Sequence, residues 1–145
     1  HTRLVSDWSS DVCSSDLDQR LWASWVIEAN ENRIFFAGDT GYADHFKDIG
    51  NKYGHFDLAL IPIGAYEPRW FMLPYHVNPD EAVKIHIDVR ATQSVGIHWG
   101  TIILTDEPLD EPPAKLAEAL KKYDVEESEF QVYQHGETRF LDDLL

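Results

Sequence analysis

The sequence predicts an α/β fold in which a mixed β-sheet is flanked by helices. Two observations carry this prediction: strand-like apolar runs alternate with helical stretches along the chain, and the run from Asp57 to Ile63 is apolar almost throughout. Such a continuous run is typical of a strand buried on both faces, as in a parallel sheet. The 145 residues fit one domain, and 43% hydrophobic residues are enough for a sizeable core.

Strand signals recur along the chain and are separated by turn residues. Aromatic and β-branched residues fill a first stretch, and the polar turn Asn30-Glu31-Asn32 separates it from a second, which indicates a hairpin. The expected strands are Leu21–Ala29, Arg33–Ala37, Asp57–Ile63, Thr92–Ile97, and a terminal hairpin in which Phe130–Tyr133 pairs with Thr138–Leu141 around His135-Gly136-Glu137.

Helix signals lie between these strands. Asn78 is a good N-cap residue, Pro79 sits at the first helical position, and Glu81 completes the spacing of a capping box. Gly54 ends a shorter amphipathic stretch. The expected helices are Tyr42–Tyr53, Pro79–Val89, and one that runs from Pro112 or Pro113 to about Tyr123.

Residues 1–17 differ from the rest of the chain. They contain Ser-Ser-Asp twice and show neither helical nor strand periodicity. This segment resembles translated read-through of a sequencing adaptor, and the alternative is a natural disordered tail. We therefore predict a non-native segment at residues 1–17 and a folded part at residues 18–145.

The charge and the cysteine content restrict the function. A net charge of -14 repels phosphate backbones, which argues against nucleic acid as a partner. Cys13 is the only cysteine, so a metal must be held by histidines and carboxylates, and a reducing cytoplasm suits the chain. No apolar run approaches the roughly 20 residues that span a bilayer. Several acidic residues are expected to be solvated charges: Asp106, Glu107, Asp110, Glu111 and the run Asp124–Glu129.

A candidate catalytic aspartate lies in Gly38-Asp39-Thr40-Gly41, directly after a predicted strand. The glycines let the backbone approach a ligand closely, and the carboxylate of Asp39 can bridge two cations. Asp39 can equally close an Asx-turn or cap the helix near Tyr42. Asp-Thr-Gly is also the signature of aspartic proteases, but no second copy is present and the helices do not suit an all-β protease half.

Two histidines are the other candidates for chemistry. His98 ends the strand before it, so its imidazole emerges at the same kind of sheet edge as Asp39, although a histidine there is often a hydrogen-bonded core residue. His76 precedes a helix, where it can contact a substrate oxygen or lie exposed in a loop. The remaining histidines are expected in the core (His86) or in surface and turn positions (His45, His55 and His135).

The loop at residues 64–74 suits an amphiphilic ligand. Its arginine fits a phosphate group, and its aromatic residues and methionine fit acyl chains. The expected substrate-binding residues are Tyr66, Arg69, Trp70, Phe71 and His76. The alternative is that Trp70, Phe71 and Leu73 cover the core while Arg69 pairs with Glu67.

Several long strings together resemble the C-terminal half of N-acyl-phosphatidylethanolamine-hydrolysing phospholipase D. They are Phe36–Tyr42, Ile61–Met72, His76–Val89, Ile97–Thr101 and His135–Glu137. The resemblance implies the metallo-β-lactamase fold, an αββα sandwich with a two-zinc site along the edge where its sheets meet. This chain would form the C-terminal half of that sandwich.

The resemblance also implies roles for the candidates. Asp39 would bridge the two zinc ions, His98 would be an imidazole ligand of one ion, and His76 would handle the substrate. Two zinc ions lower the pKa of water toward about 7, which supplies a nucleophile for phosphodiester hydrolysis. The expected substrate is phospholipid-like and the expected products are phosphatidic acid and an N-acylethanolamine. A cytoplasmic location is expected, with contact to a membrane surface left open.

The family's His-x-His-x-Asp-His motif and a further histidine have no counterpart before Asp39, because residues 1–38 contain only His1. Asp39 and His98 alone leave each zinc ion short of four ligands. We therefore expect a truncated zinc-dependent phosphodiesterase that is inactive by itself. The alternatives are another metallo-β-lactamase-fold hydrolase, with a phosphoester or lactone substrate, and a non-catalytic half-domain that pairs with another chain.

Overall fold

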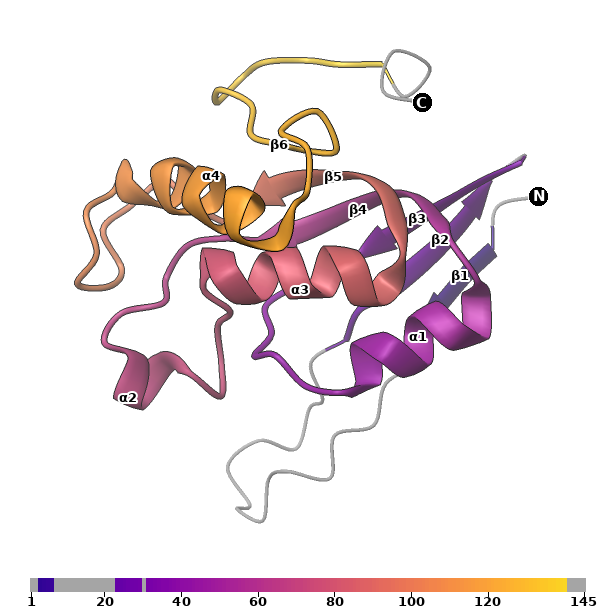
Figure 1. Ribbon diagram of the computed structural model, residues 1–145, viewed down its shortest axis with the longest axis horizontal. Coiled ribbons are helices and arrows are strands. Elements are labelled where there is room, and N and C mark those ends of the chain that lie inside the picture. Colours follow the sequence, from indigo (N-terminus) through magenta and orange to yellow (C-terminus); the bar gives the residue numbers. More distant parts are fainter. Residues whose placement is uncertain (1–2, 7–22, 30, 141–145) are drawn as a thin grey trace.

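The computed structural model describes residues 3–6, 23–29 and 31–140, which form one mixed sheet with helices against it (Figure 1). The six strands follow one another in the sheet in chain order. They are β1 (Arg3–Ser6), β2 (Trp25–Ala29), β3 (Asn32–Phe36), β4 (Phe56–Pro62), β5 (Ala91–Ile97) and β6 (Phe130–Gln131). The helices are α1 (His45–Tyr53), α2 (Arg69–Met72), α3 (Pro79–Val89) and α4 (Glu111–Tyr123).

The sheet is antiparallel at one side and parallel at the other. β1, β2 and β3 pair in antiparallel fashion, whereas β3, β4, β5 and β6 run parallel. β4 lies between β3 and β5, and five of its seven residues are buried. This pattern confirms the mixed α/β sheet, and it places the carboxyl ends of β3, β4 and β5 at one edge.

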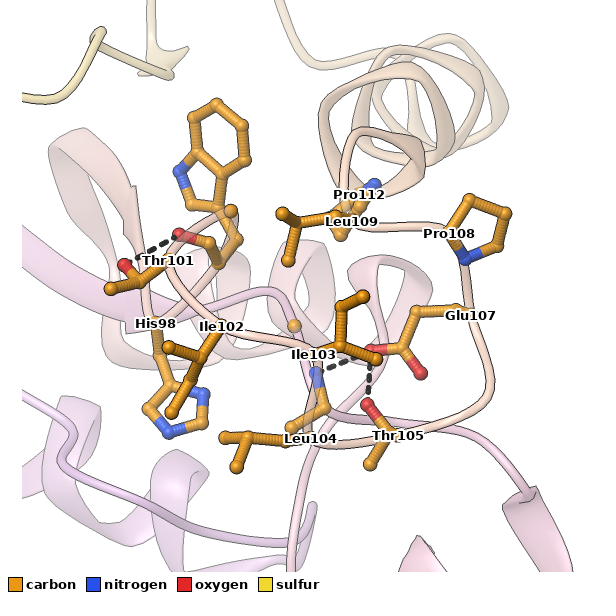
Figure 2. A pocket seen from close by; sticks show the side chains of 14 residues that line it. His98, Thr101, Ile102, Ile103, Leu104, Thr105, Glu107, Pro108, Leu109 and Pro112 are labelled. Carbon is orange, nitrogen blue, oxygen red and sulfur yellow. Dashed lines mark hydrogen bonds between the residues drawn. The ribbon is translucent and has the colours of Figure 1, made fainter.

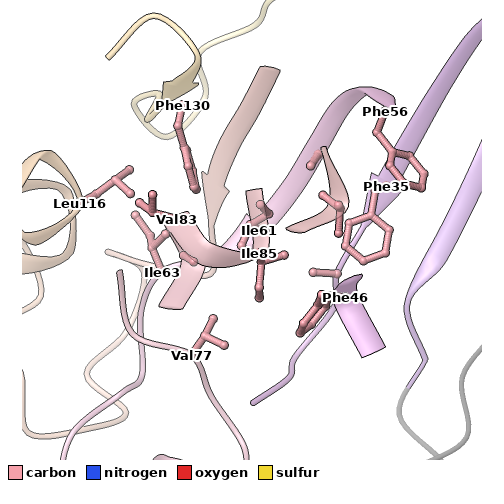
Figure 3. Close-up of a cluster of buried hydrophobic side chains, with 14 of the residues drawn as sticks. Phe35, Phe46, Phe56, Ile61, Ile63, Val77, Val83, Ile85, Leu116 and Phe130 are labelled. Carbon is pink, nitrogen blue, oxygen red and sulfur yellow. The ribbon is translucent and has the colours of Figure 1, made fainter. Parts of the chain in front are cut away.

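Three of the helices, α1, α3 and α4, form a layer on one face of the sheet (Figure 1). α3 contacts β4 and β5 and lies between α1 and α4 (Figure 1). Figure 3 shows the core beneath them. The centroid of the Phe35 ring lies 5.4 Å from that of Phe56 and 6.2 Å from that of Phe46. Strand pairing places Val26, Phe35 and Ala59 side by side on this buried face.

The opposite face of the sheet is also apolar. Cross-strand partners share a face, and a run of partners on that face joins Ile27 to Ile34, Phe36 to Leu60 and Leu60 to Val95. These side chains are only partly buried. An αββα sandwich buries such a face against its second sheet.

The predicted helix at Pro79–Val89 is confirmed at both ends. Asn78 accepts a hydrogen bond from the backbone N–H of Glu81, and the Glu81 side chain accepts one from the backbone N–H of Asn78. This is the capping box that the spacing predicted. α1 and α4 match their predictions within three residues, and Gly54 forms the C-cap of α1.

The predicted terminal hairpin is wrong. Of the two strands expected there, only Phe130–Gln131 forms one, and it pairs in parallel with Ser94 and Val95 at the edge of β5. The turn does form, since the N–H of Glu137 donates to Gln134, but residues 138–140 carry no strand. The edge of β5 has backbone N–H and C=O groups free to pair, and Phe130–Gln131 pairs with them instead of forming a hairpin.

Two short elements were not expected. α2 forms within the loop at residues 64–74, and β1 lies within the segment at residues 1–17. The rest of the predictions for residues 1–17 fall outside the described residues, as do Leu21, Trp22 and Asn30 of the first hairpin and Leu141 of the terminal one. The origin of residues 1–17 stays a prediction. Within the described ranges, no helix is long and apolar enough to cross a membrane.

His86 lies in the core, as predicted. Its side chain is 3% exposed, and its Nδ1 shares a hydrogen bond of 2.8 Å with the hydroxyl of Ser94. Nε2 lies 3.8 Å from the carboxylate of Glu129. Burial lowers the pKa of His86 from 6.5 to about 4, so the imidazole is neutral near pH 7.

We expect this histidine to make the fold sensitive to acid. The folded-state pKa lies below the unfolded value, so the unfolded chain takes up the proton first and stability falls as the pH drops from 6.5 toward 4. The loss attributable to His86 should reach roughly 2 kcal/mol at pH 5. Urea unfolding at pH 7.5 and pH 5 measures it, with His86→Asn as the comparison. An equal pH dependence in both proteins would contradict this origin.

Candidate metal and substrate site

Asp39, His76 and His98 meet at the carboxyl edge of the sheet. Each offers one ligand atom, and these atoms all lie within 4.8 Å of one another. Asp39 follows β3, His98 follows β5, and His76 lies just before α3. In the part of the chain that the structure describes, these three form the one group of histidine, cysteine and acidic side chains that could hold a metal ion.

The geometry of the three side chains fits a metal site. Oδ1 of Asp39 lies 3.5 Å from Nε2 of His98. The rings of His76 and His98 stack at 5.3 Å between centroids and 22° between planes. Their Nδ1 atoms are buried and have no hydrogen-bond partner among the described residues, although such atoms are normally paired. A carboxylate and an imidazole are donors that zinc prefers, so Asp39 and His98 fit the ion that the resemblance implies, and His76 brings a second imidazole to the same point.

Backbone contacts bring the three loops together. The N–H of Val77 donates to the carbonyl of Thr40 at 2.8 Å, which joins the segment after Asp39 to the segment of His76. At the ends of β4 and β5, the N–H of Ile63 donates to the carbonyl of Ile97. Because these contacts link segments far apart in the sequence, the convergence is a product of the tertiary fold.

Gly64 and His98 are in close contact. A Cβ atom at Gly64 would overlap the carbonyl oxygen of His98 and touch Trp99. His98 itself has a left-handed backbone with φ of 57°, and Gly100 has φ of 72°. Gly64 therefore lets the chain after β4 lie against the turn that carries the His98 imidazole.

His76 lies in a half-buried position. Burial lowers the pKa of its imidazole, and the nearby His98 lowers it further. The side chain is therefore neutral at pH 7, able to accept one hydrogen bond and to donate another.

The guanidinium of Arg69 joins Glu81 to the backbone of His76. Its Nη2 donates to both oxygens of Glu81, at 3.0 and 2.8 Å, and its Nη1 donates to the carbonyl of His76 at 2.9 Å. The alternative, that Arg69 pairs with Glu67, holds for the backbone only: the N–H of Arg69 donates to the Glu67 carboxylate at 2.9 Å. The guanidinium pairs with Glu81, because the capping box holds that carboxylate within reach. Whether Arg69 also binds substrate phosphate stays a prediction.

The aromatic residues of the same loop do not cover the core. The exposed fraction is 84% for Trp70 and 53% for both Phe71 and Leu73, so the alternative that they cover the core is wrong. Tyr66 is buried, and its hydroxyl donates to Glu111 at 2.6 Å. Burial and Glu111 raise the pKa of Tyr66, so its phenol stays protonated. The substrate-binding roles of Tyr66, Trp70 and Phe71 stay predictions.

Glu107 was expected to be a solvated charge, and this is wrong. Its carboxylate accepts hydrogen bonds from the backbone N–H groups of Ala65, Tyr66 and Glu67, at 2.7, 3.3 and 3.0 Å, and from the Thr105 hydroxyl. Although burial acts to raise its pKa, these donors hold the pKa below the usual range. Glu107 thus ties the loop after His98 to the loop after β4. Loop composition gave no signal for this contact.

A family profile described as a β-lactamase superfamily domain matches residues 5–99. The chain is 51% identical over 126 residues to N-acyl-phosphatidylethanolamine-hydrolyzing phospholipase D 1 of Caenorhabditis elegans, which covers 85% of this chain and 35% of that protein. It is 43% identical over 104 residues to the mitochondrial N-acyl-phosphatidylethanolamine-hydrolyzing phospholipase D of Saccharomyces cerevisiae, which covers 70% of this chain and 22% of that protein.

The fold has close counterparts among solved structures. Igni18, a metallo hydrolase from Ignicoccus hospitalis, superposes with a TM-score of 0.64 and 21% identity, over 95% of this chain and 52% of that one. The chain therefore spans about half of that structure and about a third of the nematode relative's length.

Proposed function

The chain belongs to the β-lactamase superfamily, and from that premise we propose that the intact protein is a zinc-dependent phosphodiesterase of the phospholipase D type. The proposed substrate is an N-acylated phosphatidylethanolamine, and the proposed products are phosphatidic acid and an N-acylethanolamine. The observation that carries this proposal is the meeting of Asp39, His76 and His98 at one sheet edge, in a chain with two such relatives. We further propose a cytoplasmic location and, because the proposed substrate is a membrane lipid, a reaction at a membrane surface.

Asp39 and His98 would hold the metal. The carboxylate has oxygens for two ions and the imidazole supplies one nitrogen, so the protein must provide further ligands for two tetrahedral ions. Zinc held there would polarise a phosphoryl oxygen and lower the pKa of water, which would make a nucleophile available. His76 faces the same point with a neutral imidazole and would hydrogen-bond a phosphate oxygen.

A chimera tests the proposal. This chain would replace the aligned region of 126 residues in the nematode relative, so that the rest of that protein is present as well. The purified chimera should contain zinc and release N-acylethanolamine from vesicles that contain N-acyl phosphatidylethanolamine, and a chelator should abolish the release reversibly. A folded, zinc-loaded chimera that leaves this lipid intact would overturn the proposed substrate, and cleavage of a lactone or another phosphoester would favour the other hydrolases.

Gly64→Ala should weaken the metal site of the chimera. The added methyl group displaces the turn of His98 and Trp99, so zinc affinity should fall roughly 10- to 100-fold, the scale seen when groups that orient ligands are changed. Competition with a chromophoric chelator measures this affinity. Gly54→Ala is the matched control. A Cβ atom at Gly54 meets nothing within 4 Å, and alanine at its φ of 88° is strained, so this variant loses stability at a place far from the metal site. Equal zinc affinities in the two variants would contradict the role of Gly64.

A further inference from the structure

An apolar pocket opens directly beside His98 (Figure 2). It has a volume of about 220 Å³, and the loop after β5 forms much of its wall. This loop contributes four aliphatic side chains to the lining, those of Ile102, Ile103, Leu104 and Leu109, and we call the cavity the Ile102–Leu109 pocket. The exposed fractions of these four side chains lie between 39% and 83%. A cluster of exposed apolar side chains is typical of a surface that binds a ligand or another molecule.

The pocket shares His98 with the metal and substrate site. Gly64 and Ala65, which follow β4 at the same sheet edge, line it as well. A molecule in this pocket therefore lies against His98, one of the three residues whose ligand atoms meet at that edge. Its volume is below the roughly 300–1,000 Å³ of pockets for drug-sized ligands, so a slender group fits better than a ring system.

The wall of the pocket is anchored. The three backbone N–H groups that donate to Glu107 fix the far end of the loop against Ala65, Tyr66 and Glu67. The Glu107 side chain is the one carboxylate of the lining, and it accepts these hydrogen bonds and one from the Thr105 hydroxyl (Figure 2). The pocket thus offers its ligand an apolar surface that is already formed.

We propose that the Ile102–Leu109 pocket binds one alkyl chain of the substrate, with the phosphodiester at Asp39 and His98. This inference rests on the proposed function for the position of the head group. It assigns a specificity role to the loop after His98, whereas the sequence had pointed to the loop at residues 64–74. The contact of an alkyl chain with these side chains needs no metal ion, so it can be measured without turnover.

Binding of hexyl-, octyl- and decylphosphocholine to the 145-residue chain tests this, by calorimetry below the micelle concentrations. Affinity should rise with chain length by up to about fourfold per methylene, which corresponds to about 0.8 kcal/mol for full burial. Leu104→Ser and Leu109→Ser should flatten this dependence. Ile87→Ser is the matched control, since Ile87 is 45% exposed on α3 and lies outside the pocket lining.

The outcomes separate this inference from the proposed function. An unchanged chain-length dependence in both leucine variants overturns the pocket, even if the chimera hydrolyses the lipid. If the chain-length dependence is lost only in Trp70→Ser, the alkyl chain lies on α2, and this outcome also overturns the proposed role of the pocket. A flattened dependence in the leucine variants supports the pocket even if the chimera lacks phosphodiesterase activity.

Discussion

Asp39→Asn in the chimera should abolish phospholipid hydrolysis and remove most of the bound zinc. The amide that replaces the carboxylate is neutral and has one acceptor oxygen in place of two, so it cannot bridge two cations. Turnover should fall by roughly three orders of magnitude or more, the scale on which the loss of one member of a catalytic unit acts. Asp39 is more than half exposed, so the substitution should leave the free energy of unfolding almost unchanged.

The measurements are zinc content by atomic absorption and product release by mass spectrometry, with urea unfolding of the same samples. Asp57→Asn serves as the control, because Asp57 is a carboxylate on the same sheet whose contacts are with Arg33 and His55. Normal zinc content in Asp39→Asn would refute its assignment as a ligand. In the 145-residue chain by itself, calorimetry should show zinc binding far weaker than in the chimera.

Local signals made most of the fold predictable. The capping box at Asn78 and Glu81 lies within four residues, and it set the start of α3 correctly. The apolar run of β4 likewise indicated a strand between two parallel neighbours, since it is apolar on both faces. The terminal segment failed for the complementary reason: the partner of Phe130 is Ser94, which is distant in the sequence, and no local turn signal reports it.

In the candidate site too, local patterns predicted some residues, whereas the places of others depend on long-range contacts. Asp39 and His98 could be proposed because each follows a predicted strand, and the ends of parallel strands share an edge. The approach of His76 depends on a bond between Val77 and Thr40, which no local pattern encodes. Glu107 was missed because its partners are backbone N–H groups of another loop, and a carboxylate in a loop gives no sign of them.

The role of His76 gives the other prediction with a large expected effect. His76→Ala in the chimera should lower turnover roughly 10²- to 10⁴-fold, the usual contribution of one positioned acid–base group. The imidazole of His76 stacks beside the ring of His98, and its ligand atom lies within 4.8 Å of those of His98 and Asp39. These distances are compatible with contact to the substrate and with binding of the metal. We expect the first of these, and zinc content should therefore stay at the level of the unaltered chimera.

Two readouts separate these roles. If His76 contacts the substrate, zinc affinity is retained and the whole loss appears in hydrolysis. A parallel loss of zinc and hydrolysis would instead make His76 a third protein ligand, which would contradict the substrate role. His55→Ala is the control, because His55 is exposed and lies outside the cluster of ligand atoms. Arg69→Gln adds a test of positioning: Arg69 binds the His76 carbonyl, so its loss should lower hydrolysis less than His76→Ala and leave zinc in place.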